Sequence, residues 1–189
     1  MPLLPPADEA PVPQDVVVAP EPPPHRRGAI AWWLVAAIIA SDQIAKALIR
    51  ASLAPFDAAT IIPGLLDFIH VRNAGVAFGI LNDYPMPYRL KSTLTTAMAA
   101  CALLGIGFYA RHVRHHEKLA RLGLSMILGG ALGNLIDRVR VGYVLDYVDV
   151  YWRGWHFWAF NIADASITIG AILVFVDLLL VTPHASHSV

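Results

Sequence analysis

The sequence predicts an all-α polytopic membrane protein with four transmembrane helices, and three observations support this prediction. Hydrophobic residues make up 57% of the 189 residues and charged residues only 15%, and the mean hydropathy is +0.55. A soluble globular domain contains about 25% charged residues, so this chain lacks the polar surface of a soluble enzyme. Four apolar segments also each approach the roughly 20 residues that a helix needs to cross a bilayer.

Charge and cysteine content exclude several other classes of protein. Fourteen basic and fourteen acidic residues cancel, so no general attraction to nucleic acid and no nucleic-acid partner are expected. The single cysteine, Cys101, excludes an intramolecular disulfide framework, and we interpret it as a packing residue. No HExxH motif occurs, so we predict neither a metal site nor a cofactor.

Composition also divides the chain. Nine of the 14 prolines fall within the first 24 residues, where apolar residues are too sparse to form a core. We therefore predict a disordered, proline-rich tail over residues 1–28. A four-helix membrane domain then covers residues 29–182, and residues 183–189 form a short C-terminal tail.

The four apolar segments differ in how well they fit a membrane span. They cover about residues 29–49, 92–110, 119–136 and 157–181. The third is the weakest, because its uncharged middle only begins at Leu122. The fourth contains Asp164 and, near its inner end, Asp177, whose side chain we expect to reach towards the aqueous boundary.

Basic residues predict the orientation of these spans. The short turn Arg111–Arg121 holds four basic residues, whereas the 42-residue connection 50–91 also holds only four. Because cytoplasmic loops are dense in Lys and Arg, we expect both termini on the cytoplasmic side.

This orientation places two connections on the outer side. The connection 50–91 is rich in turn formers, and its stretch Leu66–Val71 alternates as a short strand would. Residues 139–156 are rich in Tyr and Trp, which suits either an aromatic belt at the headgroup layer or a lid that faces the substrate.

Acidic residues in or beside the spans are candidates for function, because an aspartate at the bilayer centre costs roughly 2.5–3.5 kcal/mol. Asp42 and Lys46 are four residues apart on one helical face, which predicts an ion pair. Asp137-Arg138 at the end of the third span is typical of a charged stop signal. Gly129 and Gly133 form a GxxxG spacing that predicts close helix packing.

Two further acids suggest chemistry. Asp146 lies just beyond the third span and Asp164 about two turns into the fourth, so they meet if these spans are neighbours. Two adjacent carboxylates share one proton and can hydrolyse an amide, one activating water and the other protonating the carbonyl oxygen. Asp149 remains a rival to Asp146 on this argument.

Five short blocks in order carry a resemblance. They are Ser41-Asp42-Gln43 with Lys46, then residues 71–79 (VRNAGVAFG), 130–138 (GALGNLIDR), 142–146 (GYVLD) and 158–165 (WAFNIADA). Together they resemble the conserved blocks of lipoprotein signal peptidase, the type II signal peptidase family. The resemblance covers roughly residues 30–180 and leaves out the proline-rich tail.

The resemblance implies a four-helix membrane aspartic peptidase with a small β cradle and a short helix on the outer membrane face. It implies a bacterial cytoplasmic (inner) membrane enzyme that removes the signal peptide from diacylglyceryl-modified prolipoproteins, cutting just before the lipidated cysteine. We expect prolipoproteins and membrane lipids as partners, a monomer, an active site near the outer leaflet, and no cofactor.

Motif matches carry the family's site residues over to this chain. The catalytic pair corresponds to Asp146 and Asp164. The polar residues around the site correspond to Asn73, Gly75, Asn134, Arg138 and Asn161, and Asp42, Lys46 and Asp137 match supporting positions. Asp149 is a departure from the family pattern; it either raises the pKa of the dyad or faces water.

Two alternatives use the same acids. A proton-coupled transporter needs a polar path, but the second span offers only hydroxyl residues near one end, Ser92, Thr93, Thr95 and Thr96. A non-catalytic membrane scaffold would use the charges only to lock the helices together.

Overall fold

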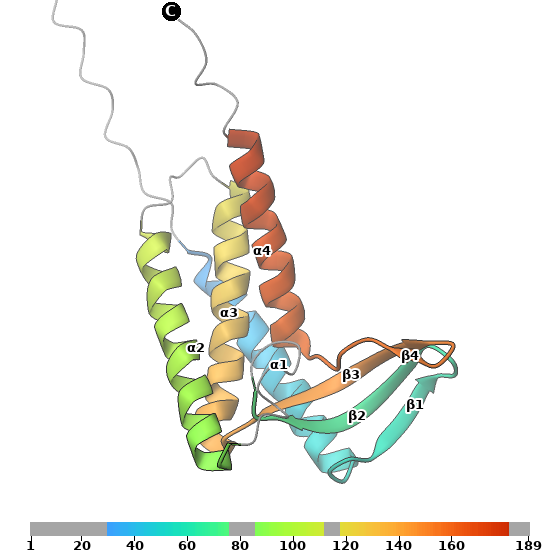
Figure 1. The fold of residues 1–189 in the computed structure, drawn as a ribbon. Helices are drawn as coiled ribbons and strands as arrows, with labels where there is room; N and C mark the ends of the chain where they lie inside the picture. Colours follow the sequence, from blue (N-terminus) through green and yellow to red (C-terminus); the bar gives the residue numbers. More distant parts are fainter. Residues whose placement is uncertain (1–29, 76–85, 112–117, 182–189) are drawn as a thin grey trace, which may run out of the picture.

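The computed structural model describes residues 30–75, 86–111 and 118–181, which form four long helices and a four-stranded antiparallel sheet (Figure 1). The helices are α1 (Trp32–Ser52), α2 (Tyr88–Ala110), α3 (Lys118–Val141) and α4 (Ile162–Val181). The strands are β1 (Ala58–Ile62), β2 (Leu66–Asn73), β3 (Val144–Trp152) and β4 (Trp155–His156), in the order β1-β2-β3-β4. The two predicted tails and the motif residues 76–79 lie outside the described residues.

All four helices are long and apolar enough to cross a membrane, so the chain is a multi-pass membrane protein. Large apolar side chains remain exposed on the helices, for example Leu104 (75%) and Leu180 (66%). A soluble protein would bury such side chains, whereas lipid tails solvate them.

Helix α3 is the centre of the bundle, because it packs most extensively against α4 and also contacts α1 and α2. Glycines permit this close approach. A Cβ on Gly130 would collide with the carbonyl oxygen of Ala163, and one on Gly123 with that of Gly170. Gly129 packs tightly against Ile38 of α1, so the close packing predicted from the glycine spacing is confirmed.

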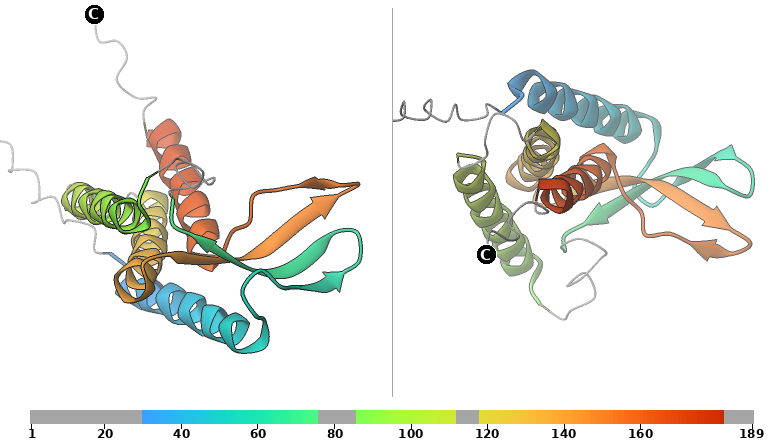
Figure 2. Two further views of the ribbon diagram at one scale, coloured as in Figure 1. Left: turned by 60° about the horizontal axis from the view of Figure 1, so that its bottom comes forward. Right: turned by 90° about the horizontal axis from the view of Figure 1, so that it is seen from above.

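The sheet lies beside one end of the bundle and projects away from it (Figures 1 and 2). Strand β2 follows α1 and pairs with β3, which follows α3, so the sheet joins the two connections on this side. The predicted strand Leu66–Val71 is confirmed and continues to Asn73. The start of α1, where Ile30 packs against Ala110 and Ala120, and the end of α4 lie at the other end of the bundle (Figure 1).

Helix α3 continues five residues beyond the predicted end at Ile136. It ends at Gly142, whose N–H donates to the carbonyl of Arg138 (3.0 Å) and whose φ is +80°. A glycine in this left-handed conformation is a common helix stop. Asp137 and Arg138 therefore lie in the last turns of α3 rather than directly after it.

The fourth span begins five residues later than predicted, at Ile162. Phe160 is extended and pairs with Val148 of β3, through N–H···O contacts of 2.8 and 3.1 Å. Asp164 is therefore in the first turn of α4 rather than two turns inside it.

The aromatic segment 139–156 contains two strands as well as exposed rings. Tyr147 is buried at 4% exposure, whereas Trp152 (60%) and Trp155 (63%) are exposed at the β3–β4 hairpin. Within residues 30–75, 86–111 and 118–181 every α-helix is one of the four long ones, so the short outer helix implied by the resemblance is not among these residues. Asp177 is buried in the protein at 8% exposure rather than extended towards water.

Candidate active site

Asp146 lies in β3, opposite Val71 of β2, with a side chain only 3% exposed. Two side-chain amides hold its carboxylate. Asn73 donates from Nδ2 to Oδ2 (3.0 Å), and Asn161 donates from Nδ2 to Oδ1 (2.8 Å). Both carboxylate oxygens of Asp146 are therefore fixed by neutral donors.

Asp164 is half-buried in the first turn of α4, where two donors also hold it. Asn134 of α3 donates from Nδ2 to Oδ1 (2.8 Å), and the backbone N–H of Asn161 donates to Oδ2 (3.3 Å). In return, the N–H of Asp164 donates to Oδ1 of Asn161 (2.9 Å). This reciprocal pair is a capping box, in which the residue before the helix and the third helical residue satisfy each other's N–H groups.

Asn161 therefore joins the two carboxylates. Its side chain is fully buried, and its Nδ2 reaches Asp146 while its Oδ1 and N–H engage Asp164. Asn161 Nδ2 also approaches the carbonyl of Leu145 (3.2 Å). The structure thus brings the two predicted acids to one amide, from different elements.

Burial dominates the electrostatics of Asp146. Removal from water raises the pKa of Asp146 to about 7, and the negative charge of Asp164 adds to the rise. The amides of Asn73 and Asn161 and the positive charge of Lys46 favour the ionised form and offset part of it. A group with this pKa can exchange a proton near neutral pH.

Gly75 and Arg138 lie beside Asn73. The N–H of Gly75 donates to Oδ1 of Asn73 (2.8 Å), which leaves the amide N–H₂ of Asn73 to face Asp146. Arg138 Nη2 donates to the carbonyl of Gly75 (2.9 Å), and its charge acts on both Asp146 and Asp164. A guanidinium thus lies within electrostatic reach of the two acids.

The predicted ion pair between Asp42 and Lys46 is confirmed at 2.9 Å and is part of a larger cluster. Lys46 Nζ also contacts Asp137 (2.9 Å) and Asn134 Oδ1 (2.9 Å). Asp42, Lys46 and Asp137 are at most 1% exposed. The cluster fixes α1 to α3 directly behind Asn134.

The acids of this cluster also bind backbone groups near the site. Asp42 accepts from the N–H of Ala163 (3.1 Å), and Asp137 accepts from the N–H of Leu145 (3.4 Å). Arg50 completes the charge balance, because its Nη2 lies 2.8 Å from Asp137. Sequence reasoning missed Arg50, although it is one helical turn after Lys46 on the same face.

Asp149 is not brought to the dyad. It is three residues after Asp146 in β3, and residues an odd number apart point to opposite faces of a strand. Its carboxylate instead lies 2.8 Å from Nδ1 of His156, whose ring stacks on Tyr151 (5.1 Å between centroids). Neither interpretation of Asp149 is supported: it is buried rather than facing water, and its carboxylate pairs with His156 rather than acting on the dyad.

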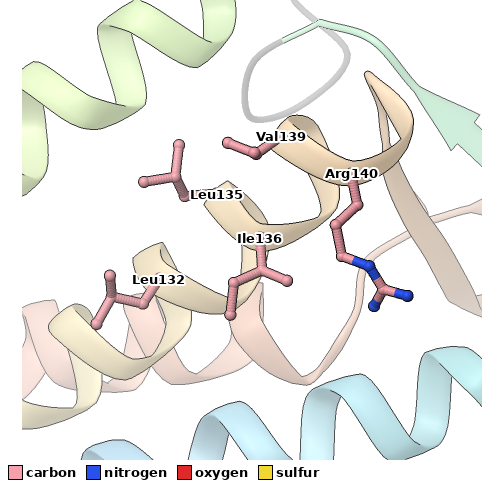
Figure 3. Close-up of a pocket in the computed structure, with 5 residues that line it drawn as sticks. All are labelled: Leu132, Leu135, Ile136, Val139 and Arg140. Atoms are coloured by element: carbon pink, nitrogen blue, oxygen red, sulfur yellow. The ribbon is translucent and has the colours of Figure 1, made fainter.

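A cavity of about 250 Å³ lies on α3, and Figure 3 shows its lining residues, Leu132, Leu135, Ile136, Val139 and Arg140. Four of these residues are aliphatic, and their helical positions lie opposite Asn134 and Arg138. The cavity therefore contains no group that activates water and is separate from the carboxylate pair.

A family comparison bears on what these two carboxylates do. A model described as signal peptidase (SPase) II matches residues 34–180. The chain belongs to the signal peptidase II family. The match includes α2, α3, the sheet, all but the ends of α1 and α4, and every residue of the candidate site.

Individual relatives within the signal peptidase II family agree. The lipoprotein signal peptidase of Solibacter usitatus is 38% identical over 149 residues, covering 79% of this chain and 90% of the relative. That of Syntrophotalea carbinolica is 42% identical over 135 residues, covering 70% and 80%. That of Pseudomonas aeruginosa is 33% identical over 155 residues, covering 81% and 90%.

Solved structures share the fold. A bacterial membrane enzyme determined by the in meso method at 2.3 Å matches with a TM-score of 0.73 and 29% identity, covering 87% of this chain and 98% of that chain. A second, at 1.9 Å, has a TM-score of 0.70 and 31% identity, covering 84% and 99%. Membership of the signal peptidase II family makes this chain a peptidase and favours that function over a transporter or a scaffold.

Proposed function

We propose that this chain is an aspartic endopeptidase that removes the signal peptide from diacylglyceryl-modified prolipoproteins by cutting just before the lipidated cysteine. The observation that carries the proposal is the pair of carboxylates, Asp146 and Asp164, joined through Asn161. Relatives that are named lipoprotein signal peptidases supply the substrate class.

The proposed reaction needs one proton on the carboxylate pair. The ionised carboxylate takes a proton from water as the water oxygen attacks the scissile carbonyl carbon, and the protonated carboxylate gives its proton to the carbonyl oxygen. The tetrahedral intermediate then collapses as the C–N bond breaks. The leaving amine takes the proton that came from water, and a hydroxyl proton of the intermediate returns to the pair. The pair ends as it began, with one proton.

The neighbouring residues have supporting roles in this proposal. Asn73, Asn134 and Asn161 hold the carboxylate oxygens in place, and Gly75 orients Asn73. Arg138 supplies positive charge beside the pair, which favours the singly ionised state that the reaction needs. Asp42, Lys46 and Asp137 fix α1 and α3 behind it.

We also propose where the protein works: in the bacterial inner membrane, as a monomer with both termini cytoplasmic, and with the sheet and carboxylate pair at the outer leaflet. The pair lies where α4 begins, at the sheet end of the bundle. The exposed rings of Trp152 and Trp155 suit the headgroup layer. A lipid-anchored substrate would reach such a site already confined to two dimensions, which lowers the entropic cost of binding.

The decisive experiment compares purified protein with its Asp146→Asn and Asp164→Asn variants on a defined diacylglyceryl-modified precursor. Each variant loses a group that transfers a proton, so cleavage is expected to fall by about 10²–10⁴-fold or more. Asp149→Asn is the matched control, because it removes a buried aspartate from the same strand and should retain cleavage within about threefold. Its partner, His156, lies outside the proposed machinery.

Three outcomes would contradict the proposal. The wild-type protein would cut nothing, either dyad variant would cleave at a near-normal rate, or the unlipidated precursor would be cut as well as the lipidated one. An arm containing a chelator tests the expectation that no metal takes part, with full activity as the expected result.

A further inference from the structure

Lys46 is buried in α1 with no exposed surface, and each of its donors has an acceptor. Its Nζ lies 2.9 Å from Oδ2 of Asp42, 2.9 Å from Oδ2 of Asp137 and 2.9 Å from Oδ1 of Asn134. A lysine ammonium has three N–H donors and no acceptor, so its bonding capacity is fully used. The two carboxylates are sufficient to balance its charge; the third contact is to a neutral amide.

The contact with Asn134 fixes which way round its amide lies. Because Lys46 can only donate, the oxygen of Asn134 must face it, and the Nδ2 of Asn134 then points to Oδ1 of Asp164 (2.8 Å). Flipping the amide would set an N–H₂ group against the ammonium and a carbonyl oxygen against the carboxylate of Asp164. The lysine on α1 thus determines which end of Asn134 meets Asp164.

The corresponding donors to Asp146 have no such cation behind them. Asn73 accepts from the backbone N–H of Gly75, and Asn161 accepts from the backbone N–H of Asp164. An amide whose oxygen binds a full positive charge is polarised and becomes a stronger N–H donor. Of the two carboxylates, Asp164 receives the charge-assisted donor.

Other charges near Asp164 do not remove this difference. Lys46 and Asp42 act on it from α1, Arg138 from α3, and Asp146 and Tyr147 from β3. The charges of Arg138 and Lys46 each act on both acids of the pair, so direct charge does not discriminate between them, and the difference lies in the donor contact from Asn134 to Asp164.

Exposure favours the same assignment. Asp164 is half-buried, whereas Asp146 is almost fully enclosed at 3% exposure. A water molecule can therefore approach Asp164 more readily, and an enclosed carboxylic acid keeps its proton more easily.

We infer that Lys46 is a positioning residue for the reaction: through Asn134 it makes Asp164 the ionised carboxylate that deprotonates water, and it leaves the shared proton on Asp146, which protonates the scissile carbonyl oxygen. The inference rests on the proposed peptidase function, and it adds a division of roles between the two aspartates.

The test is a double-substitution cycle with Lys46→Met, Asn134→Ala and the double variant, assayed on the diacylglyceryl-modified precursor from pH 5 to 9. Lys46→Met is expected to lower kcat by about 10²-fold with KM within about threefold, because it changes proton transfer rather than substrate contact. The acidic side of its pH profile should move to higher pH, since Asp164 loses its strengthened donor. The double variant should be no slower than Asn134→Ala.

Arg50→Met is the matched control. Arg50 binds the same Asp137 from the same helix (2.8 Å) but does not contact Asn134. Like Lys46→Met, this variant loses an ion pair of the cluster. A purely structural role for Lys46 therefore predicts that both variants change kcat and the pH profile to a similar extent. The proposed positioning role of Lys46 predicts that Arg50→Met keeps kcat within about threefold and leaves the pH profile unchanged.

Lys46→Met leaves Asp42 and Asp137 without their ammonium and can fail to fold, so circular dichroism and thermal melting in detergent accompany each assay. If it does not fold, Asn134→Asp replaces it. That near-isosteric change keeps an acceptor for Lys46, removes the donor to Asp164 and sets a carboxylate against it, so the loss in kcat and the shift of the acidic side to higher pH should be at least as large.

Several results would contradict the proposed positioning role of Lys46. They are a folded Lys46→Met protein with wild-type kcat and pH profile, effects of Lys46→Met and Asn134→Ala that multiply in the double variant, or an Asn134→Asp protein with an unmoved acidic side. A wild-type protein that does not cleave the precursor would contradict the peptidase proposal instead, so the two failures are distinguishable.

Discussion

Asn161 shows how one residue serves both folding and the candidate site. It precedes α4, and its exchange of hydrogen bonds with Asp164 satisfies two N–H groups that have no partner within the helix. The same asparagine donates to Asp146. The start of α4 and the geometry of the carboxylate pair are therefore set together, which ties the position of Asp164 to a helix terminus.

The raised pKa of Asp146 predicts how cleavage depends on pH. The reaction needs one proton on the pair, and burial beside Asp164 raises the pKa of Asp146 to about 7. Above this pH the proton is lost, so the rate should fall about tenfold per pH unit. Initial cleavage rates between pH 5 and 9 measure this, with Asp149→Asn as a control whose profile should match the wild type. A flat profile up to pH 9 would contradict the assignment of the proton to this pair.

At this scale the sequence predicts residue types better than residue partners. Residue spacing alone left Asp149 as a rival of Asp146, because both follow the third span. The strand β3 separates them, since residues three apart point to opposite faces. The capping box at Asn161 and Asp164 has a recognisable spacing, but the contact of Asn161 with Asp146 depends on how β3 and α4 meet, which no local pattern encodes.

At the scale of elements, the glycines between α3 and α4 control how closely these helices approach. A Cβ on Gly130 would meet the backbone carbonyl of Ala163, next to Asp164. Because neither backbone can yield without moving the helices, Gly130→Ala is expected to destabilise the protein by about 1–3 kcal/mol and to reduce cleavage. Thermal melting in detergent and the cleavage assay measure the two effects.

Gly105 of α2 offers the matched control for this prediction. Nothing lies within 4 Å of a Cβ built there, so Gly105→Ala adds a methyl group without a clash. Alanine favours a helix over glycine by roughly 1 kcal/mol, and this variant should melt no lower than the wild type. Equal destabilisation by both substitutions would show that the α3–α4 contact is not specially tight.

The predictability of the elements follows from the physics of each. Apolar length predicts all four helices, because a bilayer imposes that length, and alternation predicts β2. The boundaries are harder. Gly142 stops α3 only because its backbone is left-handed, and the pairing of Phe160 with Val148 delays α4 by five residues. Strand β3 contains both aromatic and acidic residues, so its sequence alone also fits an interfacial segment. Only its antiparallel pairing with β2 shows that it is a strand.

At the scale of the whole molecule, α3 connects α1, α4 and the candidate site. It carries Asn134 and Arg138 towards the carboxylate pair, receives Lys46 from α1, and packs its glycines on α4. By contrast, the main helix contact of α2 is with α3. Because α3 contacts both α1 and the first turn of α4, the positions of these two helices relative to each other depend on α3.

The last prediction follows from the proposed orientation and concerns the side of the membrane on which the sheet lies. Arg153 is exposed at the β3–β4 turn, and Arg111 is exposed at the end of α2, at the opposite end of the bundle. In a Cys101→Ser background, a membrane-impermeant maleimide should label Arg153→Cys in intact cells stripped of their outer membrane, and Arg111→Cys only after the inner membrane is permeabilised. The reverse pattern would place the carboxylate pair on the cytoplasmic side, where a substrate acylated in the outer leaflet does not present its scissile bond. The labelling result therefore decides between a site that meets such a substrate at headgroup depth and a site that faces the wrong side of the membrane for the proposed reaction.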